Sequence, residues 1–220
     1  MSEKKQITRK EFLKEMGYTA AGVVAVGSLS GLLTGCSTPA PAATDVDTSQ
    51  APQYPFPYEK LDPSVVEQRA FQGYKEKGGW GAGVAEGFFG ELAEKVGYPF
   101  NQIPVQAFVS YGAGFQQSSL CGSLGAAAAC IGTVCEPDIA KKVLGELENW
   151  YKEAAFPMYQ PENLNLPTTV AESLLCADSV GKFMEESGYE YGSAERKSRC
   201  AGVTADVTKK MVELLNEQFA

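Results

Sequence analysis

The sequence predicts an all-α protein: a single helical domain of about six helices that follows a signal peptide and a tether rich in Pro, Ala, Ser and Thr. Two observations favour this class. After residue 61, apolar residues recur at spacings of three, four and seven, as on one face of a helix. No segment shows the sustained apolar–polar alternation that is typical of a strand. The stretch 61–220, about 160 residues, is long enough for one domain with its own core.

Capping residues and helix breakers predict the bounds of each helix. The first predicted helix, 63–75, follows Asp62 as its capping residue and has a proline at its first position. Thr169 and Glu172 form a capping box that opens a predicted helix reaching residue 187. The other predicted helices span 80–96, 117–133, 137–155 and 193–219.

The glycine-rich segment GGWGAGVAEGFFG, residues 78–90, has two interpretations. Its spacing approaches the phosphate-binding pattern G-x-G-x-x-G. However, Glu86 stands where that pattern needs its last glycine, and no strand precedes the segment. Close packing of one helix against another is the better interpretation.

Residues 1–35 have the organisation of an export signal. A basic segment is followed by an apolar run over 18–33, which is shorter than the roughly 20 residues that a transmembrane helix needs. Within the basic segment, TRKEFLK resembles the twin-arginine export motif, with Arg9 and Lys10 at the positions of the arginine pair. That route carries proteins that are already folded. Export by the general secretory route is the alternative.

The string Leu33-Thr34-Gly35-Cys36 resembles a bacterial lipobox, which makes Cys36 the expected lipidated first residue of the mature chain. A plain signal peptide or an uncleaved anchor is the alternative. Residues 36–60 are expected to form a flexible tether. We therefore expect an exported cell-envelope lipoprotein, bound through Cys36 to the periplasmic or extracytoplasmic face of a membrane.

The net charge bears on the choice of partner. Loss of residues 1–35 removes five basic and three acidic side chains and takes the formal charge from −8 to −10. An acidic surface argues against nucleic acid as a partner and is compatible with a basic redox partner protein.

The chain has six cysteines and no histidine. The absence of histidine excludes Ser-His and Cys-His catalytic pairs, imidazole ligands to zinc, and c-type haem attached through C-x-x-C-H. What is left to the cysteines is thiolate–metal bonding or thiol–disulfide exchange.

Helical spacing sorts the cysteines. Cys121, Cys176 and Cys200 each fall on the apolar face of a separate predicted helix, so all three are expected to point inward. Cys130 is rotated to about the opposite face from Cys121, and Cys135 lies about 21 Å further along a continuous helix. Core packing, disulfides and a metal or redox site are the three open interpretations. The cations at 196, 197 and 199 favour a thiolate at Cys200, with a solvated basic turn as the alternative interpretation.

The segment LCGSLGAAAACIG, with SLLCADSVGKFMEESG and SRCAGVTADVTKKMVELLN, resembles the redox-active proteins named for their C-GCAxxG-C-C pattern, a group related to the split-Soret cytochromes. The resemblance implies a helical domain with a thiolate-bound iron–sulfur cluster or a redox dithiol. By position, Cys121, Cys176 and Cys200 match the second, third and fourth motif cysteines. The first would fall near Gly81 or Ala82, which cannot bind a metal, and the haem motifs of the split-Soret relatives are missing.

Cys130, Cys135 or another subunit of a homo-oligomer are therefore possible sources of an additional ligand. The expected function is an exported, membrane-tethered redox protein that passes electrons to a partner rather than transforming a substrate. The alternative is a non-catalytic structural or binding lipoprotein subunit whose cysteines belong to the core or form disulfides.

Overall fold

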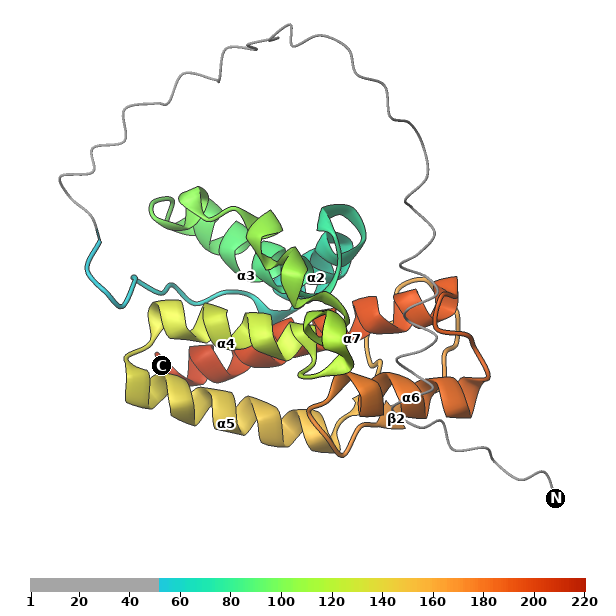
Figure 1. The fold of residues 1–220 in the computed structure, drawn as a ribbon. Coiled ribbons are helices and arrows are strands. Elements are labelled where there is room, and N and C mark those ends of the chain that lie inside the picture. Colours follow the sequence, from blue (N-terminus) through green and yellow to red (C-terminus); the bar gives the residue numbers. More distant parts are fainter. Residues whose placement is uncertain (1–51) are drawn as a thin grey trace, which may run out of the picture.

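The computed structural model describes residues 52–220, which form a helical domain (Figure 1). Cys36, Arg9 and Lys10 lie outside the described residues. The described α-helices are α2 (Pro63–Lys77), α3 (Trp80–Lys95), α4 (Gly122–Val134), α5 (Pro137–Glu153), α6 (Cys176–Ser187) and α7 (Ala194–Gln218). Short helical turns are η3 (Phe100–Gln102), η4 (Val105–Tyr111) and η5 (Gly114–Ser118).

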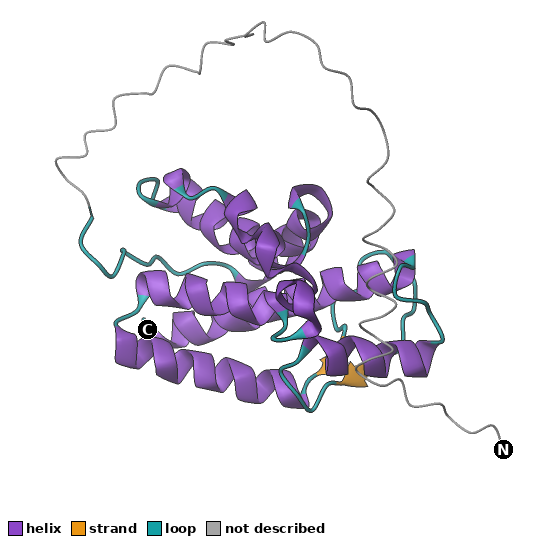
Figure 2. Ribbon diagram, in the orientation of Figure 1, coloured by secondary structure: helices purple, strands orange, loops and turns teal. Residues whose placement is uncertain are grey.

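A very small sheet completes the fold. Strands β1 (Ala155–Phe156) and β2 (Thr169–Val170) pair antiparallel, and Figure 2 shows how little of the domain they occupy. The all-α prediction is confirmed. Within residues 52–220, no helix is both long enough and apolar enough to cross a membrane.

Helix α7 is the central element, because it contacts all the other described α-helices. Its inward face includes Val203, Val207, Met211 and Leu214, which are buried as their spacing predicts. Helices α4 and α5 lie alongside it, and the α2–α3 pair packs across it (Figure 1). The helix that carries Cys200 is thus held from several sides.

The glycine-rich segment serves helix packing, as predicted. A Cβ atom at Gly83 would lie 2.8 Å from the Ala70 carbonyl oxygen of α2 and 2.8 Å from the Thr204 methyl group of α7. Gly87 is equally close to α2. These two glycines let α2 and α7 approach α3 closely.

The domain begins earlier than predicted. Residues assigned to the tether lie against the core: Phe56 packs edge-on against Phe100, and the Tyr58 hydroxyl donates a 2.8 Å hydrogen bond to Asn216 Oδ1. The prediction rested on a composition rich in Pro and Ala, which buries little apolar surface. The rings of Phe56 and Tyr58 bury enough apolar surface to hold this segment against the domain.

Two predicted helix starts are wrong. The helix expected from residue 117 begins instead at Gly122, because residues 119–121 pair with a distant segment and Phe115 and Gln116 have positive φ angles of 56° and 60°. The expected capping box of Thr169 and Glu172 does not form. Thr169 belongs to β2, Glu172 has a φ of 54°, and α6 begins at Cys176. In both places, backbone pairing between distant segments replaces a local helix signal.

We expect Gly83→Ala to lower the free energy of unfolding by about 1–3 kcal/mol, because its methyl group would overlap α2 and α7. Gly145→Ala is the matched control, since Gly145 lies inside α5 with no atom within 4 Å of the added methyl group. This control should gain about 0.5–1 kcal/mol from the better helix former. Urea unfolding followed by circular dichroism measures both, and equal effects would contradict the packing argument.

Candidate functional site

Two distant backbone segments bring Cys121 and Cys176 together. Leu120 and Leu175 form an isolated antiparallel bridge. The Cys121 N–H donates to the Leu174 carbonyl at 2.9 Å, and the Cys176 N–H donates to the Ser119 carbonyl at 2.6 Å. Each cysteine therefore stands at the start of a helix, Cys121 as the cap of α4 and Cys176 as the first residue of α6.

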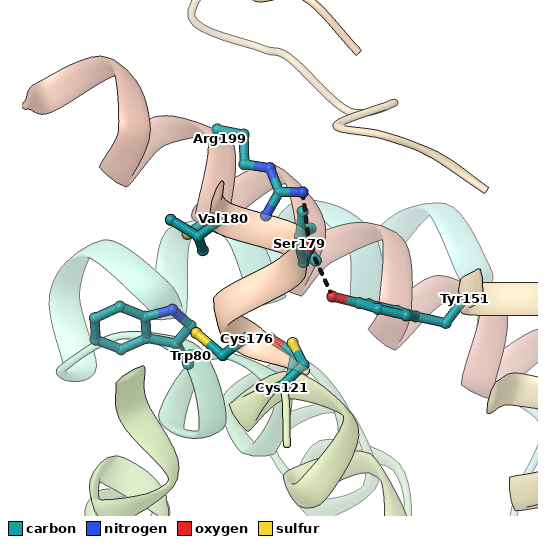
Figure 3. A pocket seen from close by; sticks show the side chains of 10 residues that line it. Trp80, Cys121, Tyr151, Cys176, Ser179, Val180 and Arg199 are labelled. Carbon is teal, nitrogen blue, oxygen red and sulfur yellow. Dashed lines mark hydrogen bonds between the residues drawn. The ribbon is translucent and has the colours of Figure 1, made fainter. Parts of the chain in front are cut away.

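Cys200, near the start of α7, reaches the same place. Cys121, Cys176 and Cys200 all line one narrow pocket, which has room for about one water molecule. Figure 3 shows Cys121 and Cys176 in this pocket. The other lining residues are Trp80, Ser123, Tyr151, Ser179, Val180, Arg199 and Val203. All five cysteines of residues 52–220 are free thiols and are buried.

The pocket supplies the soft sulfur donors that iron–sulfur clusters use. As the side chains stand, however, no group of three or more Cys, Asp or Glu residues within 52–220 is arranged to hold a metal ion. The chemistry of the three thiols therefore suits a bound metal. Their present arrangement, however, does not place all three as ligands of one ion.

The structure does not bring Cys130 or Cys135 to this pocket. Helix α4 is continuous, so it carries Cys130 into the main core, where burial raises the pKa of its thiol. Cys135 follows the last residue of α4, and its carbonyl accepts a 2.7 Å hydrogen bond from the Tyr54 hydroxyl. Both behave as core residues in this arrangement.

Trp80 stands at the wall where the first motif cysteine is absent. A Cβ atom at Gly81 would lie only 2.4 Å from the Phe108 carbonyl oxygen, so a cysteine cannot be restored there without moving the backbone. The indole of the preceding residue, Trp80, lines the pocket (Figure 3). An aromatic ring therefore closes this side.

Two buried arginines lie beside the thiols: Arg199 lines the pocket, and Arg196 contacts the Cys200 sulfur from outside it. Arg196 and Arg199 are only 3% and 2% exposed. Arg196 Nη1 lies 3.7 Å from the Cys200 sulfur, and Arg199 Nη2 donates a 2.8 Å hydrogen bond to the Ser179 hydroxyl. Arg199 Nε is buried without a hydrogen-bond partner. Lys197, which the sequence groups with them, is exposed.

A buried tyrosine joins this network. The Tyr151 hydroxyl donates to Ser179 at 3.1 Å, as drawn in Figure 3, so Ser179 accepts hydrogen bonds from two side chains. Burial raises the pKa of Tyr151 well above its usual value, and the charge of the neighbouring Cys121 adds to this shift. Burial likewise raises the pKa of Cys176, helped by Cys121 and Cys200 and opposed by the two arginines. In the metal-free protein, Cys176 is therefore a thiol at neutral pH.

Sequence reasoning did not identify Trp80, Tyr151 or Ser179 as pocket residues. Ser179 had a local signal, since it lies three residues after Cys176 on the same helix face. Tyr151 had none, because α5 contains no cysteine and reaches the pocket only through the tertiary fold.

The fold and this pocket define a class: an all-helical domain with a pocket of buried thiols and two buried guanidinium groups beside them. A family model described as "Putative redox-active protein (C_GCAxxG_C_C)" matches residues 84–214. The chain belongs to this family, which confirms the resemblance seen in the sequence. The match begins after Gly81 and Ala82, where the first motif cysteine was sought.

The chain is also similar to the split-Soret cytochrome c of Desulfovibrio desulfuricans, with 30% identity over 223 residues that cover 97% of this chain and 79% of that protein. A solved structure, described as "A novel iron centre in the split-Soret cytochrome c from Desulfovibrio desulfuricans ATCC 27774", matches with a TM-score of 0.71 and 31% identity. It covers 74% of this chain and 72% of the other. Family and relative together support a redox role.

We expect Ser179→Ala to lower the free energy of unfolding by about 1–3 kcal/mol, because two buried donors, Arg199 Nη2 and the Tyr151 hydroxyl, lose their common acceptor. Ser198→Ala is the matched control on the exposed side of α7, where the serine contacts Glu162. Its effect should stay within about 0.5 kcal/mol. Urea unfolding of both variants tests the argument, and a Ser179→Ala protein as stable as the control would refute it.

Proposed function

We propose that this chain is an exported, membrane-tethered redox protein whose electron-carrying centre is built on Cys121, Cys176 and Cys200. One observation carries the proposal. Three thiols from separate parts of the chain line a single pocket beside two buried guanidinium groups. Ordinary core cysteines have no need of buried cations, whereas thiolates do.

The cofactor proposed for this centre is an iron–sulfur cluster held by the thiolates of Cys121, Cys176 and Cys200. When bound, such a cluster supplies one-electron chemistry. The positive charge of Arg196 and Arg199 favours the ionised form of the cysteines, and the starts of α4 and α6 add the positive ends of two helix dipoles. A fourth ligand from a second subunit or a non-cysteine donor would complete the usual coordination.

The walls of the pocket favour electron transfer over chemistry on a bound substrate. Trp80, Val180 and Val203 present apolar surface to the thiols. Such a wall excludes water and keeps the local dielectric constant low. Electrons would pass to a partner protein, and the acidic surface of this chain suits a partner with a basic face.

The cysteines can be tested by anaerobic purification with assays for iron, acid-labile sulfide and visible absorption. Cys121→Ser, Cys176→Ser and Cys200→Ser should each abolish iron incorporation, because each removes a proposed ligand. Cys130→Ser is the control: it should keep the iron and cost about 1–3 kcal/mol of stability, since its hydroxyl would be buried in the core.

Two outcomes would contradict the proposed centre. Loss of iron from Cys130→Ser to the same extent as from the three pocket variants would show that packing, not ligation, is measured. A wild-type protein with neither iron nor a reversible disulfide between pocket cysteines would leave a non-catalytic binding or structural lipoprotein as the better description. A reversible disulfide without iron would support the redox-dithiol form of the centre.

Anchoring is a separate prediction. Lipid attached to Cys36 would supply the membrane affinity that the acidic domain lacks. Cys36→Ser should therefore abolish the acyl mass and move the protein from the membrane fraction to the soluble fraction. Intact-mass measurement and fractionation test this, with Cys135→Ser as a control that should stay on the membrane. A mature N-terminus elsewhere, without acyl mass, would end the lipoprotein assignment.

A further inference from the structure

We propose that Arg196 is the positioning residue that sets the reduction potential of the cysteine centre, through its contact with the sulfur of Cys200. The inference rests on the proposed redox function and deepens it, because it assigns control of the potential to one side chain and one sulfur. It applies to the iron-bound form and to the dithiol form of the centre, since in both forms the sulfur gains electron density on reduction.

Arg196 contacts Cys200 inside the protein, where water does not weaken the interaction. The two residues lie one turn apart on α7, and Arg196 Nη1 lies 3.7 Å from the Cys200 sulfur, within the range of an N–H···S hydrogen bond. Both residues are 3% exposed. In so low a dielectric, a guanidinium beside a sulfur favours the state in which that sulfur carries more negative charge.

The guanidinium of Arg196 is held in place by the segment that precedes α7. Its Nε donates a 2.5 Å hydrogen bond to the Tyr191 carbonyl, and its Cζ lies 4.4 Å from the centre of the Tyr191 ring. Ser193 Oγ accepts a 3.1 Å hydrogen bond from the Arg196 amide. Backbone and side chain are both fixed, so the positive charge has a defined place beside the sulfur.

No carboxylate forms an ion pair with this charge. Arg196 takes part in none of the ion pairs within the described part of the chain. Arg69, in contrast, is ion-paired with Glu86, Glu91 and Glu94. The charge of Arg196 is therefore available to the Cys200 sulfur.

Arg199, the other buried arginine, plays a different part. Its Nη2 donates to the Ser179 hydroxyl, as Figure 3 shows, and its guanidinium lies 5.6 Å from the centre of the Phe183 ring. Both contacts are with α6, so Arg199 holds this helix against α7. Its charge also interacts with the buried carboxyl of Asp206.

The position of Arg196 lets its contact persist when the pocket is filled. Cys200 lines the pocket, whereas Arg196 does not. Arg196 therefore reaches the sulfur from outside the pocket, and the pocket side of the sulfur stays free to bond a metal or a second sulfur. Hydrogen bonds to the ligating sulfurs are one of the factors that set the potential of an iron–sulfur cluster.

The experiment measures the reduction potential of the full-length protein, purified without oxygen. Protein that carries iron is titrated electrochemically and followed by visible absorption; its centre takes up one electron and no bond breaks. Protein in the dithiol form is equilibrated with glutathione. The disulfide between Cys200 and a second pocket cysteine then takes two electrons and two protons from two glutathione thiols, which become glutathione disulfide. Peptide mass mapping identifies the bonded pair.

Arg196→Gln should lower the reduction potential, because it removes the charge that stabilises the reduced centre. We expect at least a tenfold change in the equilibrium constant, which is about 30 mV for the two-electron dithiol and about 59 mV for a one-electron cluster. Arg196→Lys keeps the charge but loses the Nε donor to Tyr191, so its potential should lie between those of the wild type and the glutamine variant. It also serves as the test if the glutamine variant does not fold.

Two controls separate the charge at the sulfur from other effects. Lys197→Gln removes the same charge from an exposed neighbour on the same helix turn. Ser193→Ala removes the cap of α7 and loosens the turn that carries Arg196, while the guanidinium remains. The equilibrium constant of both variants should stay within twofold of the wild-type value.

Three results would overturn the inference. The first is a potential that Arg196→Gln leaves unchanged, or a disulfide that does not include Cys200. The second is an equal shift in Arg196→Gln and Ser193→Ala, which means that loosening of the helix is measured. The third is an Arg196→Lys protein with the potential of either the wild type or the glutamine variant. A wild-type protein without any reversible couple would contradict the proposed function itself, whereas a wild-type couple that is insensitive to Arg196 contradicts this inference alone.

Discussion

The pairing of residues 119–121 with 174–176 is the constraint on which the site depends. The hydrogen bonds from the Cys121 and Cys176 amides hold the starts of α4 and α6 side by side. The pairing ends both extended segments at a cysteine and starts both helices there. One backbone interaction thus brings two thiols and two helix dipoles to the same wall.

Helix α7 supplies the rest of the site, and its own position is fixed from outside the pocket. Gly202 lets the segment after β1 approach closely, because a Cβ atom there would lie 2.6 Å from Pro157 and from the Tyr159 carbonyl. One turn later, Asp206 accepts the amides of Met158 and Tyr159. Burial raises the pKa of Asp206 to about 7, even though both hydrogen bonds favour the carboxylate. These contacts fix the rotation of α7 and hence the direction in which Arg199 and Cys200 face.

The sequence correctly predicted the features that depend on neighbouring residues in the chain. The predicted cap at Asp62 opens α2, as its side-chain hydrogen bonds to first-turn amides show, and the three motif cysteines are buried as predicted. It failed where distant segments pair: the predicted helix included residues 119–121, yet their pairing with residues 174–176 delays the start of α4 to Gly122. Tyr151 was missed for the same reason, since no local pattern relates α5 to a cysteine pocket.

The charge balance of the pocket links the ionisation of its thiols to whatever fills it. Three thiols in a low-dielectric site cannot all lose protons unless cations lie close, and here two guanidinium groups provide that charge. A metal ion bound to the thiols would place further positive charge beside them and so favour their ionisation. Trp80 lies at the wall where the first motif cysteine is missing, so the pocket carries fewer thiols than a four-thiolate site and the two guanidinium groups have less negative charge to balance.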